Sequence, residues 1–491
     1  MDQLASVLLA FPPEDAAQLA DNEQYHKAAQ IHVARLYKLL KERTRDLVTH
    51  ASDLFNVVNP AVNSLSFLTL LHALSFPSPA ANVSRDVIAE KFAIFAMTFD
   101  GRQCRYAAGL WGDFIQAISS GQLIGPAVAI ECLVSAILRL DPSGSILTST
   151  HLTLVSLAYR TNNIYRALPV IDKNIVFYPD MSKNEDSHYL CDLTLPPPAY
   201  ISRLTGLTQS LKSTNVLDYG LVCGLMYISV RDWEKAGAAL EKVVTHPTKE
   251  GGVSTYMVDA YKKWILVHLL CTGSFRETPP LVSAATNKSY STLAKPYTQL
   301  ARAFASDEAA ELKSIAEQNT SIWVEDANVG LVKEVLNMYQ KWRVLLLKDV
   351  YDKISISEIR QQTKSAETGQ KLASDDEVEF LIHEMITQGL LKGTMGTSDD
   401  GTKFLAFFSN TAQALSETQF AVTIQETASR LAALRSAFLA TNQRLSTNKD
   451  YIRYAIRDAK RDKLGESLDP TLGFEASVDD EDLMGGLATV V

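Results

Sequence analysis

One short stretch of the chain, from Leu381 to Phe408, carries residue types that could do chemistry. It begins with the pair His383-Glu384 in a helical pattern. A metalloprotease helix needs a second histidine four positions after the first, with the glutamate as base. Thr387 occupies that position, and the nine histidines never occur as His-x-His. We therefore expect no zinc hydrolase site here, no metal ligands and no other cofactor.

The same stretch contains glycines with the outer spacing of a phosphate-binding loop. Gly396 and Gly401 are followed by Thr402 and Lys403, which reverses the order of the Lys-Ser/Thr pair in that motif. A strand pattern comes next, whereas a phosphate loop leads into a helix N-terminus that can hold an anion. We interpret both glycines as turn residues of a hairpin, where a positive φ favours glycine.

A third possibility for this stretch is DNA recognition by the helix expected from Ser374 to Leu391. That helix carries five acidic residues and no Lys or Arg, and residues 348–408 hold 7 basic and 11 acidic residues. The whole chain is acidic too, with a net charge of −9. A polyanion would be repelled, so we expect no direct contact with nucleic acid.

Neither the cysteines nor the apolar segments indicate a disulfide framework or a membrane protein. The five cysteines occur singly, which favours free buried thiols in a reducing compartment. The apolar run from Leu123 to Leu140 contains Pro126 and Glu131, as expected of a buried core helix rather than a membrane span. The N-terminus lacks a basic signal region. We expect a soluble protein of the cytoplasm and nucleus, without membrane contact.

Helical patterns separated by short breaks fill the chain from Tyr25 to about Val350. One pair of segments fits the tetratricopeptide pattern, in which small residues let two helices approach and large ones fill the gap. A looser pair spans residues 151–172, so we predict degenerate repeats that present a surface to partners. The matching positions of the first pair are Gly224, Tyr227, Ala236, Leu240 and Pro247.

The segment between these two helical pairs ends in Pro197-Pro198-Ala199-Tyr200, which matches the PPxY ligand of WW domains. Short proline motifs also recur by chance. We favour the second interpretation, in which the segment is a connection that ends one helix and begins the next.

After Val350 the pattern changes to a short extended entry in "YDKISISEI", two helices and a hairpin. Ser355 with Glu358, and Ser374 with Glu377, have capping-box spacing at the two helix starts. The second helix carries an apolar stripe, and two apolar runs then bracket a polar turn. This order predicts a winged helix. The stripe consists of Val378, Leu381, Ile382, Met385 and Ile386.

The second strand of that hairpin, "KFLAFF", is apolar on both alternating faces. An exposed edge strand of this kind invites association, so Leu405 and Phe407 are candidate partner-interface residues through strand addition. The alternative is that the second face packs against its own chain.

A helix expected from about Ser416 to Lys463 carries an apolar residue every seven positions, which keeps one seam turned toward partner helices. The seam also contains Thr427, Thr441 and Asn448, so it is too polar for a two-stranded coiled coil and fits a mixed bundle with other chains. The alternative is that the helix folds back on its own chain. The candidate interface residues are Ile424, Leu431, Leu434, Phe438, Leu445 and Ile452.

The last residues, from Glu466 to Val491, hold seven acidic residues and no Lys or Arg. Such a segment cannot bury enough surface to order itself. Ser477 precedes the acidic sequence "VDDED" and is a possible phosphorylation site. The alternative is a solubilising tail without regulation.

Helical hairpins, a winged helix and a long terminal helix together resemble the PCI-domain family. The segments Leu293–Ile359 and Tyr219–Pro247 are similar to the COP9 signalosome subunit 3 family, and the similarity is clearest over residues 217–408. The resemblance implies a mainly α protein. Its parts are tetratricopeptide-like repeats at 1–214, a PCI domain at 215–409 with the winged helix at 351–409, a helix for an inter-subunit bundle at 410–463, and an acidic tail at 464–491.

The resemblance also implies a role. Members of the family are non-catalytic scaffold subunits of the complex that removes Nedd8 from cullins and so regulates cullin–RING ubiquitin ligases. The implied partners are other subunits of PCI and MPN type, with the ligases reached through the complex, and the implied state is a hetero-oligomer.

Three other functions compete with this one. The chain could be a PCI scaffold of the proteasome lid or of translation initiation factor three, and residue patterns alone do not separate these assemblies. A nucleic-acid-binding PCI protein would need a basic winged helix, and the sequence has an acidic one. An enzyme is the third, but the sequence contains no nucleophile elbow, dinucleotide fingerprint or metal cluster.

Overall fold

The computed structural model describes most of the chain. The described residues are 2–13, 21–76, 83–179, 189–247, 252–306, 308–398, 401–408, 417–449, 451–453 and 456. Two compact units, Met1–Ala414 and Leu415–Val491, are each described by themselves.

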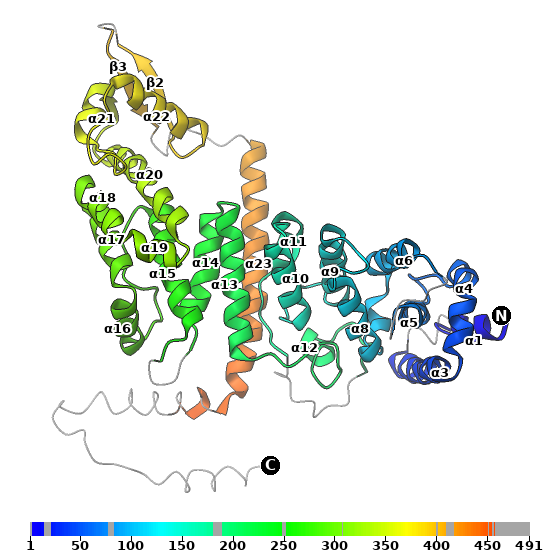
Figure 1. Ribbon diagram of the computed structural model, residues 1–491. Coiled ribbons are helices and arrows are strands. Elements are labelled where there is room, and N and C mark those ends of the chain that lie inside the picture. Colours follow the sequence, from blue (N-terminus) through cyan, green and yellow to red (C-terminus); the bar gives the residue numbers. More distant parts are fainter. Residues whose placement is uncertain are drawn as a thin grey trace, which may run out of the picture. The chain divides into compact units, whose positions relative to one another are not determined.

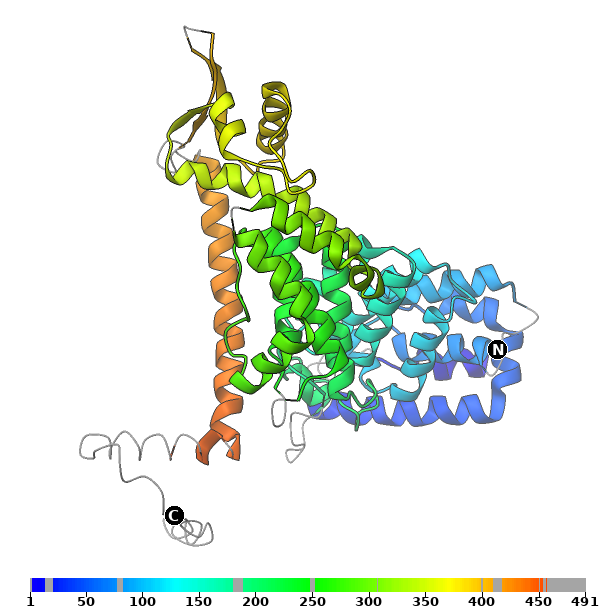
Figure 2. The same cartoon turned by 60° about the vertical axis from the view of Figure 1, so that its left-hand side comes forward.

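The first unit is mainly helical, which confirms the prediction of a mainly α protein (Figure 1). Helices that are close in the chain lie side by side, as both views show (Figure 1, Figure 2). The helices of its first half are α1 (Asp2–Leu9), α3 (Asn22–Thr49), α4 (Ala51–Val57), α5 (Ser64–Ser75), α6 (Arg85–Thr98), α7 (Gly101–Cys104), α8 (Ala108–Ser119), α9 (Pro126–Leu140), α10 (Ser149–Arg160), α11 (Ile164–Ile171) and α12 (Pro197–Tyr200).

The second half of this unit continues the helical stack and ends in a small sheet. One core of buried apolar side chains runs from Leu4 to Ala366, through both halves. Its helices are α13 (Ser213–Ser229), α14 (Trp233–Val244), α15 (Thr255–Thr272), α16 (Ala284–Leu293), α17 (Lys295–Ala305), α18 (Ala309–Gln318), α19 (Thr320–Glu325) and α20 (Val329–Leu346), followed by a 3-10 turn, η1 (Leu347–Asp349).

The predicted tetratricopeptide-like pair corresponds to α13 and α14, which pack closely. A Cβ atom at Gly224 would lie 2.7 Å from Cδ2 of Leu240, and one at Gly220 would lie 2.6 Å from Cγ2 of Val243. Both partner side chains are buried. The small residues of one helix therefore admit the large residues of the other, as the pattern predicts. The looser pair, α10 and α11, also forms a helical hairpin.

Two further expectations concern buried elements. The apolar run Leu123–Leu140 contains α9, whose apolar face is buried in the core, so the prediction of a core helix is confirmed. Across the described helices, none combines the length and the apolarity that a membrane crossing requires. The prediction of buried thiols holds for four cysteines but is wrong for Cys271, which lies in the last turn of α15 and is exposed.

After η1 the chain forms a second, smaller core, here called the sheet module (residues 344–407). It contains two helices and three strands, and its strands form an antiparallel sheet in the order β1-β3-β2. The elements are β1 (Lys353–Ser355), α21 (Ile356–Gln362), α22 (Asp375–Thr387), β2 (Gly393–Thr397) and β3 (Lys403–Phe407).

Local sequence signals account for most of this module. Ser355 and Glu358 form the reciprocal capping box that their spacing predicts. Ser374 caps α22 through the N–H of Glu377, whose carboxylate accepts from the N–H of Ala373 instead of Ser374. Val378, Ile382 and Met385 of the predicted apolar stripe are buried in the module core, and Leu381 and Ile386 pack against it.

The prediction that β3 offers a free edge to a partner is wrong. β3 is the central strand: Ala406 lies opposite Lys353 of β1 and Thr394 of β2. The side chain of Leu405 is 0% exposed and that of Phe407 is 9% exposed. The three-residue strand β1 takes the edge that the hairpin alone would leave open, so neither residue is available to a partner.

The glycines of the hairpin differ in their roles. Gly401 has φ +76° and serves the turn, as predicted. Gly396 instead lies within β2 opposite Phe404, and a Cβ there would come within 2.7 Å of Cζ of that ring. The interpretation of Gly396 as a turn residue is therefore wrong, because this residue lies within a strand. Its lack of a side chain makes room for the Phe404 ring.

The sheet module is joined to the helical stack by more than the continuous helix α20. Nζ of Lys341, a side chain that is largely buried, lies 3.0 Å from Oε1 of Glu384 on α22. The loop between α21 and α22 turns back on α18: Ala366 is buried in the main core, and Nζ of Lys313 donates to the Thr368 carbonyl at 3.4 Å. The long loop between the two helices therefore fastens the module to the repeats.

The second unit contains α23 (Glu417–Thr447, orange in Figure 1). The helix predicted to extend unbroken to Lys463 ends instead at Thr447. Asn448 starts a new helical segment, since its side-chain oxygen accepts from the N–H of Tyr451 at 3.2 Å and its carbonyl from the N–H of Ile452 at 3.0 Å. Residues 457–463 lie outside the described part of the chain.

Candidate interaction surfaces

The predicted heptad positions of α23 all have exposed side chains. Leu431 and Phe438 are each 67% exposed, and Ile424 and Leu434 are exposed to a similar degree. Leu445 is 37% and Ile452 42% exposed, with Ile452 beyond the break at Asn448. Other described positions of the helix are exposed as well, so the seam is defined by apolar side-chain type and spacing.

The PPxY sequence lies in the helical turn α12, with Pro198 and Tyr200 buried. The guanidinium of Arg105 lies over the Tyr200 ring, 3.4 Å from its centroid. Nη1 of Arg105 also donates to the carbonyls of Leu190 and Asp192, at 2.8 and 2.9 Å. A WW domain needs an extended, accessible motif. The interpretation of this segment as a structural connection is confirmed.

The residues that suggested metal chemistry do not come together. His383 is exposed on α22, and Thr387 donates its hydroxyl to the His383 carbonyl. Within the described residues, no group of three or more His, Cys, Asp or Glu side chains is arranged to hold a metal ion.

The acidic residues of α22 form part of the module's own structure. Asp375, Asp376 and Glu377 occupy the first turn, where negative charge is favourable to the helix dipole. Asp375 pairs with Arg360 at 3.0 Å, and Glu379 pairs with Lys403 of β3. These ion pairs occupy Arg360 and Lys403, two basic side chains that could otherwise contact a phosphate backbone.

Three of the buried thiols, those of Cys104, Cys132 and Cys223, have environments that suppress nucleophilic chemistry. Burial raises the pKa of the Cys223 thiol to about 12 and that of Cys132 to about 11. Burial also raises the pKa of Cys104 well above its usual value. The reactive species of cysteine is the thiolate, so these groups stay protonated at neutral pH and serve as small apolar residues.

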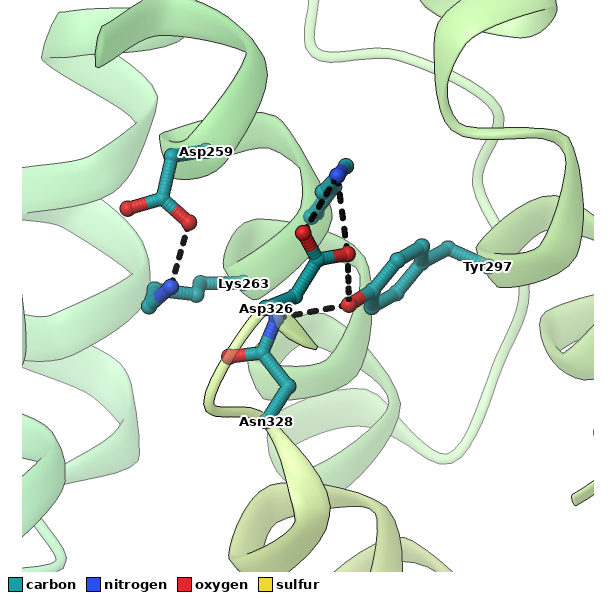
Figure 3. A network of polar contacts seen from close by, with 6 residues as sticks. Asp259, Lys263, Tyr297, Asp326 and Asn328 are labelled. Carbon is teal, nitrogen blue, oxygen red and sulfur yellow. Dashed lines mark hydrogen bonds and ion pairs between the residues drawn. The ribbon is translucent and has the colours of Figure 1, made fainter. Parts of the chain in front are cut away.

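A polar network that sequence patterns do not reveal connects α15, α17 and the turn between α19 and α20 (Figure 3). Nζ of Lys262 lies 2.8 Å from both carboxylate oxygens of Asp326, and Tyr297 donates its hydroxyl to Asp326 at 2.8 Å. Nδ2 of Asn328 donates to the Tyr297 hydroxyl at 2.7 Å. The neighbouring pair Lys263–Asp259 lies on α15.

This network stabilises the fold and does not resemble an active site. Tyr297 is fully buried, and burial raises its pKa far above the usual value for tyrosine. Asp326 and Asn328 flank α20 at its start, so their bonds fix how that helix leaves α19. A buried network of hydrogen bonds of this kind specifies packing.

Two surface features were not predicted from the sequence. Phe380 lies on the outer side of α22 with 72% of its side chain exposed, outside the apolar stripe. A cleft of about 270 Å3 lies beside α13 and α14. The predicted phosphorylation site Ser477 and the acidic tail lie outside the described residues.

Comparison with known proteins places these features in a family. A family model described as the N-terminal helical repeats of COP9 signalosome complex subunit 3 matches residues 30–286. The COP9 signalosome complex subunit 3 of Neurospora crassa is 40% identical over 499 residues, covering 99% of each chain. Its counterpart in Emericella nidulans is 28% identical over 448 residues, covering 87% of this chain and 88% of the relative.

A plant protein gives the same assignment over a shorter region. The COP9 signalosome complex subunit 3 of Arabidopsis thaliana is 25% identical over 252 residues, covering 51% of this chain and 56% of the relative. The full-length similarity to the Neurospora protein and the match to the helical repeats together decide the assignment. The chain belongs to the COP9 signalosome subunit 3 family.

Proposed function

We propose that this chain is a non-catalytic scaffold subunit of the COP9 signalosome, the complex that removes Nedd8 from cullins. Family membership along the whole chain supports the assignment to this complex. The observation that carries the scaffold role is the exposed apolar seam of α23, since a row of leucine and phenylalanine side chains in water favours association.

The proposal assigns a task to each part of the chain. Tetratricopeptide-like repeats occupy residues 1–214, and a PCI domain occupies residues 215–409. Its winged helix, at 351–409, is supported by the order of two helices and a small antiparallel sheet. Residues 410–463 join helices of other subunits in a bundle, and residues 464–491 form an acidic tail.

The bundle requires partner helices from other chains, because no other segment of this sequence has a matching heptad pattern. The seam contains Thr427 and Thr441 beside its leucines. Such a mixed seam suits a bundle of several different helices better than a homodimer. We propose that the partners are PCI and MPN subunits of the same complex, in the cytoplasm and nucleus, and that cullin–RING ligases are reached through the assembly.

The proposal leaves catalysis to another subunit. In this chain His383 has no second histidine at metal-ligand spacing, and Cys104, Cys132 and Cys223 are buried thiols with raised pKa values. A nucleic-acid-binding function is not favoured, because α22 is acidic and two nearby basic side chains already pair with its Asp375 and Glu379 carboxylates.

Affinity purification of the tagged full chain at native level, followed by mass spectrometry, tests the proposed function. The expected result is a stoichiometric set of signalosome subunits. Recovery of proteasome-lid or initiation-factor subunits in their place would contradict it. Elemental analysis and a cullin-deneddylation assay of the purified single chain should give neither zinc nor activity, and activity of that chain would contradict the non-catalytic role.

A further inference from the structure

The cleft beside α13 and α14 is lined by segments that are distant in the sequence. Its volume is about 270 Å3, and the end of α11 and the segment that follows α11 form the opposite wall. Its floor is apolar, with the buried side chains of Leu147, Ile171, Leu217 and Val243. Gly220 also lines the cleft, where its lack of a side chain makes room for Val243.

The wall that follows α11 is held in place by backbone hydrogen bonds. The N–H groups of Val176 and Phe177 both donate to the Ser145 carbonyl, at 2.8 and 2.9 Å. The N–H of Leu147 donates to the Phe177 carbonyl at 3.0 Å. The cleft is therefore preformed, which reduces the entropy cost of binding.

The rim of the cleft is basic although the chain as a whole is acidic. Among the described residues, three lysines line it, Lys173, Lys235 and Lys242, against one carboxylate, Asp172. Asp172 accepts from the Tyr227 hydroxyl at 2.8 Å and pairs with Lys235 at 3.1 Å. In the part of the chain that the structure describes, Lys173 and Lys242 have no ion-pair partner.

We propose that this cleft binds a short peptide segment of a partner protein in which carboxylates flank a large apolar side chain. The floor takes the apolar side chain, whose removal from water supplies most of the binding free energy. Lys173 and Lys242 pair with the carboxylates and fix the direction of the peptide. The volume suits one large side chain rather than a drug-sized molecule.

Other anionic ligands fit the cleft less well. A nucleotide base would need an open aromatic face for stacking. Of the tyrosines that line the cleft, Tyr219 and Tyr227 are buried and Tyr178 is half-buried. A long nucleic acid would meet a surface of net negative charge beyond the rim. A short acidic peptide requires only the local lysines. The site lies between the segment 147–178 and the helices α13 and α14, so the inference does not depend on the proposed role of α23.

A direct test measures binding of a fluorescein-labelled peptide, Asp-Phe-Asp-Phe-Asp, to the full chain by fluorescence anisotropy. The neutral peptide Gln-Phe-Gln-Phe-Gln and the small peptide Asp-Ala-Asp-Ala-Asp separate the contributions of charge and apolar burial. The expected result is that the acidic phenylalanine peptide binds most tightly and that added salt weakens it.

Two variants locate the binding. Lys173→Glu with Lys242→Glu reverses the rim charge, and we expect binding weaker by about tenfold or more. Ala238→Trp fills the cleft from an exposed position on α14 and should weaken binding similarly while the lysines remain. The matched control is Lys288→Glu with Lys333→Glu, two exposed lysines outside the cleft, and it should bind like the unchanged chain.

Three outcomes would overturn the proposal. The first is that the peptide does not bind the unchanged chain, and the second is that it binds both cleft variants and the control variant with equal affinity. The third is that an unlabelled single-stranded oligonucleotide or inorganic phosphate binds more tightly than the peptide and loses affinity in the same variants, which would assign the cleft to a different ligand. Thermal melting of each variant is the control for folding. A variant that loses binding but melts like the unchanged chain has lost the site and not its fold.

Discussion

Strand β3 and helix α23 are both apolar stretches near the carboxyl end of the chain, and the sequence suggested both as partner surfaces. The structure separates them. Leu405 of β3 is 0% exposed at the centre of a three-stranded sheet, whereas Leu431 and Phe438 of α23 are each 67% exposed. The first stretch forms part of its own core, and the second has side chains free to contact another chain.

The difference shows that an apolar pattern indicates that residues are buried, but does not indicate whether the same chain or another chain covers them. The two faces of β3 are apolar because the strand is central, with β1 and β2 hydrogen-bonded on either side. The seam of α23 has the spacing of a helix bundle, but its own unit supplies no second described helix of comparable length. A stretch that finds partner segments within its own chain becomes part of the core. A stretch that finds none stays exposed and can contact another subunit.

The strongest way to break this comparison is to truncate the buried strand. Leu405→Ala should destabilise the sheet module by about 2–5 kcal/mol, because it leaves a cavity in a packed core. Urea unfolding and hydrogen exchange of peptides from residues 353–407 measure the loss. Phe380→Ala, which removes an exposed ring from α22, is the control and should cost less than about 0.5 kcal/mol. A stable Leu405→Ala chain that loses its partners would restore β3 as an interface.

Acid provides a second contrast, because buried histidines occur in the helical repeats whereas α23 contains none. Burial lowers the pKa of His32 from 6.5 to about 4 and that of His151 from 6.5 to about 3. Below pH 6.5 these two histidines bind protons in the unfolded chain but stay neutral in the folded chain. Each histidine therefore removes about 1.4 kcal/mol of stability per pH unit as the pH falls toward the folded pKa.

Urea unfolding between pH 7 and pH 4.5 checks this effect. His32→Gln keeps a hydrogen-bonding group near Ser66, the partner of His32 at 3.0 Å, but cannot titrate. This variant should lose stability with falling pH less steeply than the unchanged chain. If the free energy of unfolding falls equally steeply with pH in both proteins, His32 binds its proton at the same pH in the folded and unfolded chains, which would contradict the lowered pKa.

A matched pair of glycine variants sharpens the contrast between packed and open helix faces. Gly224→Ala places a Cβ 2.7 Å from Cδ2 of the buried Leu240 and should cost about 1–3 kcal/mol. Gly112→Ala, in α8, meets nothing within 4 Å and should be neutral or stabilising by up to about 1 kcal/mol. Thermal melting distinguishes them, and equal effects would contradict the close packing of α13 on α14.

Local signals account for what the sequence could predict. The capping box of Ser355 and Glu358, the stripe on α22 and the Gly224–Leu240 approach each depend on residues close in the chain or on a recurring motif. The helical class and the candidate seam on α23 follow from periodicity in the same way.

The features that were missed depend on contacts between distant segments. The three-residue strand β1 lies in a segment predicted to be extended, but its pairing with β3, about fifty residues away in the chain, makes β3 central and was not predicted. The Arg105–Tyr200 contact buries a motif that looks accessible in sequence. The break at Asn448 depends on a single capping hydrogen bond, which heptad spacing does not register.

The smallest expected effect on the chain's own stability is also the most informative about assembly. Leu431→Ala with Phe438→Ala removes two exposed side chains, so unfolding of the single chain should change by less than about 0.5 kcal/mol. If these side chains are buried in a bundle, each truncation costs about 2–5 kcal/mol of association. Every 1.4 kcal/mol corresponds to about tenfold in affinity. The control is Val422→Ala with Leu439→Ala, which lie off the seam and are also exposed, at 54% and 56%.

The decisive measurement is quantitative mass spectrometry of the subunits that co-purify with the tagged double variant, compared with the unchanged chain and the off-seam control. We predict that Leu431→Ala with Phe438→Ala loses its partner subunits while its melting temperature stays that of the unchanged chain, and that the control keeps its partners. A double variant that retains all its partners but melts much earlier would show that the seam belongs to an internal core, and would contradict the proposed scaffold role of α23.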